Sequence, residues 1–151
     1  HTEFYYGEFF KGKTKEEAHR EFFEETLKCV KAFDCFNVLG HLDYIVRYGP
    51  YQDKTVDHAK YQDIIDEIFK TLIKKGKGIE VNTSGYKDLK ICGFPNYEQV
   101  QRYYDLGGRI ITIGTDSHTS DRVGENCLTV AKKYQEIGFE DVSTFTGRVK
   151  D

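Results

Sequence analysis

The sequence contains neither methionine nor tryptophan, and its first residue is His1, so we expect that the chain does not begin where its gene begins. No large excess of charge is present, because 22 basic and 25 acidic residues give a net charge of −3. This balance argues against nucleic acid or an anionic membrane as a partner. The apolar runs are shorter than the ~18 residues of a membrane span, and a signal-peptide layout is missing. We therefore expect a soluble, cytoplasmic protein.

Cysteine occurs without the C-x-x-C spacing of a structural zinc site or a thioredoxin-like motif. The four positions are Cys29, Cys35, Cys92 and Cys127. We expect reduced thiols, most of them packed against other side chains.

The length of 151 residues suits one domain but falls short of the roughly 200–250 residues of a complete α/β barrel. Helical and strand-like patterns alternate along it. Helices are expected at 15–33, from about 54 to 75, at 96–104 and at 122–137, and strands at 36–40, 79–82, 109–114 and 142–145. Segment 1–13 is expected to connect elements on the surface, and 83–96 to form a loop of functional length. The alternation predicts right-handed β-α-β units and a parallel sheet.

Side chains of the kinds that bind metal ions stand at the ends of successive expected strands. They are His41 and Asp43 after the first, Glu80 and Asn82 in the second, and Asp116 and His118 after the third. Parallel α/β folds bind ligands at the carboxyl ends of their strands, so these side chains are expected to meet at one rim. Three coincident pairs favour a shared metal or catalytic site.

Each pair also has a simpler interpretation. Asp116 or Ser117 could cap the following helix, and a single histidine after a strand is commonly a hydrogen-bonded structural residue. The rim could also bind a ligand without catalysing a reaction.

The loop after the first strand carries Arg47, Tyr48 and Tyr51. The guanidinium could hold a phosphate or carboxylate through its two-pronged geometry, helped by a tyrosine hydroxyl. The alternative is a surface arginine stacked on tyrosines. His19 and His58 lie among charged residues in expected helices, and we expect both to be solvated.

Three motifs at this rim resemble, in order and spacing, the histidinol-phosphatases of the PHP (polymerase and histidinol phosphatase) superfamily. They are GHLDYIVRYG at 40–49, EVNTSG at 80–85 and GTDSH at 114–118, and the pieces at 9–12 and 137–139 are similar too. The resemblance implies part of a distorted (β/α)7 TIM-like barrel, an α/β fold with a parallel sheet. The complete domain would hold two or three divalent metal ions, Zn, Fe or Mn. The implied reaction is hydrolysis of L-histidinol phosphate, a small-molecule phosphate ester, to L-histidinol and phosphate in histidine biosynthesis.

The resemblance also implies a role for each rim residue. The metal ligands would be His41, Asp116 and His118, catalysis would fall to His118, Asp116 and Glu80, the substrate would contact Arg47, Tyr48 and Asn82, and Asp43 would orient the metal cluster. His118 or another rim residue would protonate the leaving alkoxide.

The family's N-terminal portion, with its opening His-x-His pair, has no counterpart here, so residues 1–151 resemble the C-terminal portion of a single catalytic domain. We expect the chain alone to be inactive or very weak, and to self-associate through its open barrel edge or to need the missing half. Two alternatives stay open: a PHP phosphoesterase for another phosphorylated small molecule, and a non-catalytic PHP-like module acting in assembly.

Overall fold

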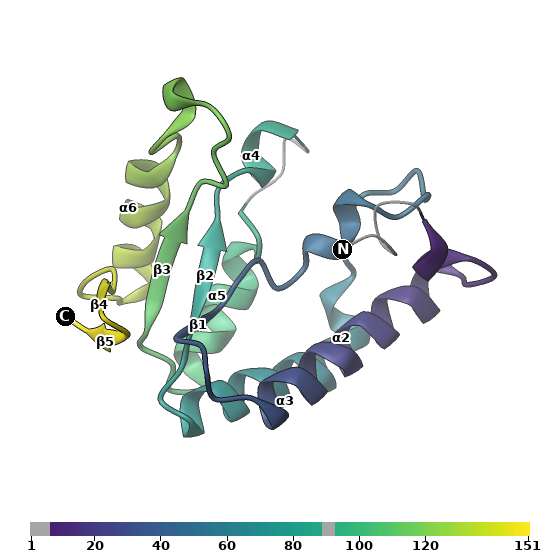
Figure 1. Ribbon diagram of the computed structural model, residues 1–151, viewed down its shortest axis with the longest axis horizontal. Helices are drawn as coiled ribbons and strands as arrows, with labels where there is room; N and C mark the ends of the chain where they lie inside the picture. The colour runs from purple at the N-terminus through teal and green to yellow at the C-terminus, as the bar shows by residue number, and fades with distance from the viewer. Residues whose placement is uncertain (1–6, 89–92) are drawn as a thin grey trace.

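The computed structural model describes residues 7–88 and 93–151. Its sheet consists of β1 (Val38–Leu39), β2 (Gly78–Asn82) and β3 (Ile111–Gly114), all parallel and in the order β1-β2-β3 (Figure 1). Helix α3 (Gln62–Lys74) lies between β1 and β2 in the chain, and α5 (Tyr97–Asp105) lies between β2 and β3. The expected parallel α/β sheet is confirmed, and the carboxyl ends of its strands share one edge.

Helix α2 (Lys15–Ala32) begins at the expected capping box. The Thr14 side chain accepts a hydrogen bond from the Glu17 N–H, and the Glu17 carboxylate accepts one from the Thr14 N–H. The helix then lies alongside α3 (Figure 1).

Helix α3 begins later than the expected start near residue 54. The Asp53 carboxylate accepts hydrogen bonds from the N–H and hydroxyl of Thr55, at 3.0 and 2.6 Å, and pairs with Lys15 at 2.6 Å. A turn of this kind satisfies the backbone without a helix. The chain therefore becomes helical only at the 3₁₀ helix His58–Tyr61, which leads into α3.

The expected loop 83–96 contains the short helix α4 (Gly85–Asp88). Residues 89–92, and with them Cys92, lie outside the described residues. At the end of the segment the Asn96 side chain accepts a hydrogen bond from the Gln99 N–H at 3.0 Å and so caps α5, as expected.

Helix α6 (Cys127–Ile137) also begins later than the expected residue 122. Gly124 and Asn126 have positive φ angles of 80° and 63°, which interrupt a right-handed helix. The residues before them form the 3₁₀ helix Ser120–Arg122.

The expected strand 142–145 does not extend the parallel sheet. Instead β4 (Phe145–Thr146) and β5 (Val149–Lys150) pair with each other as an antiparallel hairpin. Gly147 and Arg148, between them, have φ angles of 54° and 70°, and positive values at both central residues characterise tight hairpin turns. A backbone hydrogen bond of 2.8 Å from the Ser143 N–H to the Ile111 carbonyl joins the segment to β3.

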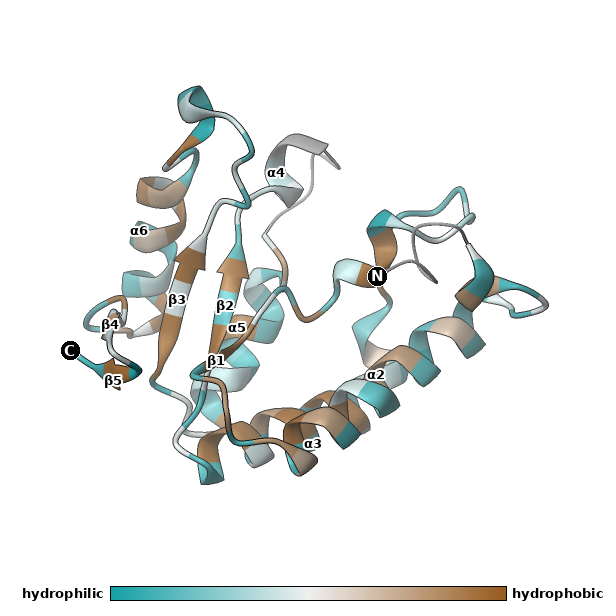
Figure 2. Cartoon of the chain, viewed as in Figure 1, coloured by the Kyte–Doolittle hydropathy of each residue, from teal (hydrophilic) through white to brown (hydrophobic). Residues whose placement is uncertain are grey.

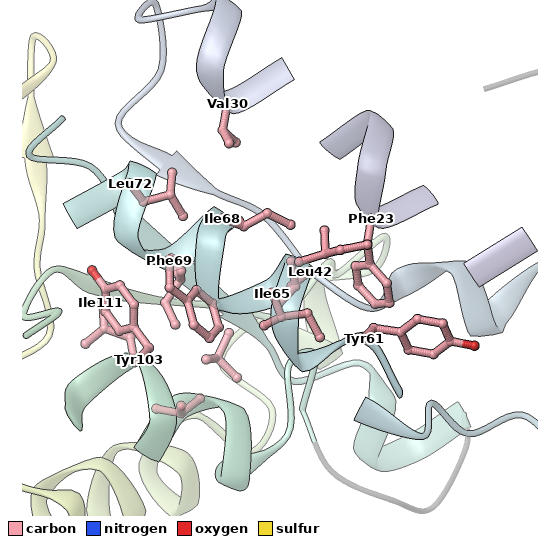
Figure 3. Close-up of a cluster of buried hydrophobic side chains, with 14 of the residues drawn as sticks. Phe23, Val30, Leu42, Tyr61, Ile65, Ile68, Phe69, Leu72, Tyr103 and Ile111 are labelled. Carbon is pink, nitrogen blue, oxygen red and sulfur yellow. The ribbon is translucent and has the colours of Figure 1, made fainter. Parts of the chain in front are cut away.

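The main core lies between the sheet and the helices. Figure 3 shows α3 side chains packed against neighbours from α2 and α5, and Ile65, Ile68, Phe69 and Leu72 are fully buried. Figure 2 shows the apolar residues of α3 gathered together and polar residues on the outer helix surfaces. Across residues 7–88 and 93–151, none of the helices is both long and apolar enough to cross a membrane.

A second cluster packs beneath the segment that follows β1. The 3₁₀ helix Glu8–Phe10 buries Phe10 there, so this part of segment 1–13 is not confined to the surface as expected. Its buried members are Phe10, Ala18, Ile45, Val46 and Phe94. The cluster supports the residues that form the rim.

The cysteines that the structure describes are free thiols, as expected. Their packing differs from the expectation, because Cys29 and Cys35 are exposed and Cys127 is half-buried.

The two helical histidines are not solvated, which corrects the sequence-based expectation. His19 is 1% exposed, and its ring lies 6.4 and 6.0 Å from the rings of Tyr51 and Tyr61. The His58 side chain is 10% exposed. Charged neighbours in the sequence concealed that both rings face inward.

Burial of His19 predicts a loss of stability in mild acid. Desolvation, with a smaller contribution from the Lys15 charge, lowers the His19 pKa from 6.5 to about 4, while Asp53 opposes this and His58 adds to it. The unfolded chain therefore binds this proton more readily, and stability falls as the pH drops from 6.5 towards 4. We expect a loss of about 2 kcal/mol from this group, measured as the urea midpoint at pH 7 and pH 4.5. A His19→Leu variant should lose less unfolding free energy between these two pH values than the parent chain. An equal loss would contradict the assignment of this pH dependence to His19.

Candidate functional site

The segment after β1 presents its side chains with a period of three. His41, Tyr44 and Arg47 are half-buried at the rim. The residues between them are buried: Leu42, Asp43, Ile45 and Val46. Residues Tyr44–Arg47 form a 3₁₀ helix, in which side chains three apart lie above one another. The His41 and Tyr44 rings stack with centroids 4.3 Å apart, and the Arg47 guanidinium lies 4.5 Å from the centre of the Tyr44 ring.

Glu80 occupies the middle of this rim, on the central strand β2. Its Oε2 accepts a hydrogen bond from the His41 N–H at 3.2 Å. A Cβ atom at Gly40 would lie 3.2 Å from that same oxygen, and one at Gly114 would overlap the other carboxylate oxygen. The carboxylate therefore fits between β1 and β3 because both flanking positions are glycine.

Asp116 follows β3 and contacts two residues of the segment after β1. Its Oδ2 accepts hydrogen bonds from the Tyr44 hydroxyl at 3.3 Å and from the Arg47 guanidinium at 3.5 Å. Asp116 and His41 both have positive φ angles, 49° and 30°, which residues with a side chain rarely adopt. Such conformations persist where surrounding contacts hold them and are common at functional sites.

His118 lies next to Asp116 but points into solvent. Its Nε2 is 3.7 Å from the Asp116 Oδ1, and its side chain is 87% exposed. Within the described part of the chain, His, Cys, Asp and Glu side chains do not gather in a group of three or more that could hold a metal ion. The expected ligands His41, Asp116 and His118 are thus at one rim without closing around a common point.

Arg47 is held from three sides. Its guanidinium donates to the Ser84 hydroxyl at 2.9 Å, to the Tyr44 hydroxyl and to Asp116. The side chain is 23% exposed, so a surface arginine stacked on tyrosines describes it only in part. The Tyr48 ring lies 5.5 Å from that of Tyr44. Burial, followed by a hydrogen bond with Tyr48, raises the pKa of the Tyr44 hydroxyl above its ordinary value.

Three of the expected residues are set back from the rim. Asn82 is 2% exposed, and its side-chain oxygen accepts a hydrogen bond from the Ser84 N–H at 2.9 Å, which places Ser84 beside Arg47. Asp43 is 4% exposed and pairs with His58 at 3.0 Å. Tyr51 donates to the Lys13 carbonyl and packs on Phe10, away from the rim.

Sequence reasoning missed Tyr44, Ser84 and His58 as parts of the site. Tyr44 and Ser84 lie inside the motifs at 40–49 and 80–85, and the spacing of Tyr44 from His41 and Arg47 was a usable signal. His58 is 15 residues from Asp43 and had no such signal.

Comparisons with known proteins identify the family of this chain. Residues 1–84 match the family model described as PHP domain. The histidinol-phosphatase of Lactococcus lactis is 39% identical over 93% of this chain and 52% of its own length. The probable histidinol-phosphatases of Thermotoga maritima and Clostridium acetobutylicum are 36% and 33% identical and are covered over 51% and 52% of their lengths.

The fold of this chain is also similar to that of a solved structure. The crystal structure of histidinol phosphate phosphatase from Lactococcus lactis, complexed with zinc, L-histidinol and phosphate, superposes with a TM-score of 0.87 over 95% of this chain and 54% of that one. The described sheet is therefore part of a TIM-like barrel, as expected. The chain spans about half the length of these relatives. With more than half of its residues matched by the family model, the chain belongs to the PHP domain family.

Proposed function

We propose that this chain is the C-terminal portion of the catalytic domain of a cytoplasmic, metal-dependent phosphomonoesterase that hydrolyses L-histidinol phosphate to L-histidinol and phosphate in histidine biosynthesis. The relatives compared above are histidinol-phosphatases or probable histidinol-phosphatases, which supports this proposal. The observation that carries it is the position of Arg47, whose guanidinium lies between Ser84 and Asp116 at the strand ends. A cationic group held there can receive a phosphate oxygen next to carboxylates and imidazoles.

Divalent metal ions suit the donors at this rim. The Glu80 carboxylate rests in a cradle that a Cβ at Gly114 would fill, and His41 and Asp116 add an imidazole and a second carboxylate. Nitrogen and oxygen donors of this kind suit Zn, Fe and Mn. We propose that His41, Asp116 and His118 would hold such ions, two or three in the complete domain, together with ligands from outside this chain. When bound, the ions would supply a hydroxide nucleophile near neutral pH and neutralise phosphate oxygens.

The chain's own residues would bind the ester and move one proton. Arg47 would hold a phosphate oxygen, with Tyr48 beside it and Asn82 acting through Ser84. Glu80 would orient the attacking water from the central strand. As the P–O bond to histidinol breaks, His118 or another rim residue that is not bound to an ion at that moment would deliver a proton to the leaving alkoxide and then recover one from solvent.

The 151-residue chain alone is expected to release phosphate from histidinol phosphate at least ~1000-fold more slowly than the protein at the length of its relatives. The reason is that its expected ligands do not close around a metal ion within the described residues. The measurement is phosphate release with added Mn²⁺ or Zn²⁺, on histidinol phosphate and on a panel of other phosphomonoesters.

Each result of that assay has a distinct meaning. Robust turnover by the 151-residue chain would contradict the need for a missing half. Preference of the longer protein for another ester would identify a different PHP phosphoesterase, and inactivity on every ester with metal bound would favour an assembly module.

We also propose that the chain self-associates through β1, which pairs only with β2 among the described residues. Sedimentation of the 151-residue chain would test this.

A further inference from the structure

Asp43 and His58 form a buried pair behind the rim. The Asp43 Oδ2 and His58 Nε2 are 3.0 Å apart, and the two side chains are 6% and 10% exposed. Asp43 precedes the 3₁₀ helix Tyr44–Arg47, but its side chain does not cap that helix. Its other oxygen, Oδ1, is buried and has no hydrogen-bond partner among residues 7–88 and 93–151. Within that range the Asp43 side chain therefore depends on His58, because a buried polar group needs a hydrogen-bond partner.

The second ring nitrogen of His58 fixes its orientation. Nδ1 lies 3.5 Å from the side-chain nitrogen of Asn96. The side-chain oxygen of Asn96 already accepts the Gln99 N–H at the start of α5, so its amide group faces His58 as a donor. His58 then accepts at Nδ1 and donates from Nε2 to Asp43. It joins the rim segment to the start of a helix in the main core.

Packing alone does not secure this part of the rim. A half-open pocket of about 120 Å³ adjoins the pair, and Asp43, Val46, His58, Phe94 and Asn96 are among its lining residues. Side chains that line this pocket lack protein contacts on that side. Two residues before Asp43, His41 holds a φ angle of 30°, a conformation that surrounding contacts must maintain.

We infer that His58 is a positioning residue that acts through Asp43, holding the turn so that His41, Tyr44 and Arg47 stay aligned along the rim. The period of three links these positions, because rotation of the turn at Asp43 would move all three side chains together. The consequence for catalysis rests on the proposed function, whereas the structural consequence can be measured on the chain itself.

Hydrogen exchange on the 151-residue chain tests the structural part. The amides of Tyr44 and Val46 donate to the carbonyls of His41 and Asp43, and the Ile79 amide, in the sheet, donates to Ile110. In His58→Leu we expect exchange at Tyr44 and Val46 to rise at least ~10-fold relative to Ile79. His58→Gln should stay within ~3-fold of the parent, because the glutamine amide can replace the Nε2 donor.

Kinetics on the protein at the length of its relatives test the catalytic part. We expect His58→Leu to lower kcat/KM for histidinol phosphate about 30-fold, and His58→Gln to restore most of it. Adding Asp43→Asn to His58→Leu should lower kcat/KM by less than a further ~3-fold, because Asp43 and His58 act as one unit. His19→Leu removes another buried histidine and is the control for general destabilisation.

The inference would be overturned by equal acceleration of exchange at Ile79 and Tyr44, by the same loss in the Gln and Leu variants, or by independent effects at positions 43 and 58. A loss in His19→Leu equal to that in His58→Leu would overturn it as well. If the parent does not hydrolyse histidinol phosphate, the proposed function fails, and the exchange pattern still decides whether His58 positions the rim.

Discussion

Arg47→Ala is expected to lower kcat/KM for histidinol phosphate by about 10²- to 10³-fold in the protein at the length of its relatives. The guanidinium is held by Ser84, by the Tyr44 hydroxyl and by Asp116, so its position is fixed before substrate arrives. A charge-assisted hydrogen bond from a fixed donor gains strength as charge builds on the phosphate oxygens. Inorganic phosphate should also bind more weakly as a product inhibitor.

Lysine should not restore this activity. The guanidinium donates from two different nitrogens, one to Ser84 and one towards Asp116, and a single ammonium group cannot occupy both places. We therefore expect Arg47→Lys to stay within ~10-fold of Arg47→Ala.

Arg102→Ala provides a matched control. Arg102 also makes a two-point ion pair, with Asp66, but on the helix surface away from the rim. Its loss should leave kcat/KM nearly unchanged, because the pair joins α3 to α5 and contacts none of the rim residues that hold Arg47. An equal loss of activity in the Arg102 variant would show that disruption of any arginine pair, rather than loss of a phosphate contact, explains the effect of Arg47→Ala.

The rim could be located from the sequence because parallel strands carry their carboxyl ends to one edge. Helical periodicity and strand-like runs predicted β1, β2 and β3, and the residues at their ends followed from them. His41, Glu80 and Asp116 do lie at that edge. What could not be foreseen was the direction of each side chain. Asn82 is buried behind Ser84, and His118 points into solvent.

Long-range pairs and local turns account for the remaining differences. No periodic pattern links Asp43 to His58, because their hydrogen bond depends on how a loop folds back against α5. The residues 142–145 have a strand-like composition, but the positive φ angles at Gly147 and Arg148 turn the chain into its own hairpin. Composition predicts that a segment can form a strand, whereas the turn after it determines which strand it pairs with.

Gly114→Ala is expected to lower kcat/KM about 100-fold while leaving the protein folded. An added Cβ would overlap the Glu80 carboxylate, which is the mobile end of a long side chain and can rotate away. The cost to unfolding free energy should be only about 1 kcal/mol, typical of mild overpacking. The displaced carboxylate would leave the rim, and with it the hydrogen bond to the His41 N–H.

Gly40→Ala is the graded control on the opposite side of the same carboxylate. Its Cβ would lie 3.2 Å from the Glu80 Oε2, so a shift of a few tenths of an ångström relieves the contact. We expect a loss of only about 3-fold from this change, well below that of Gly114→Ala. The two glycines thus test whether activity follows the displacement of one side chain.

Combining Gly114→Ala with Glu80→Ala identifies the route of the effect. If the alanine at 114 acts by displacing Glu80, it should cost little further activity once Glu80 is already removed, because the two changes then delete the same interaction. A further 100-fold loss in the double variant would mean that the methyl group blocks substrate or metal directly. In that case Gly114 would be needed because it leaves space for substrate or metal at the rim. Its small size would then not serve to accommodate the Glu80 carboxylate.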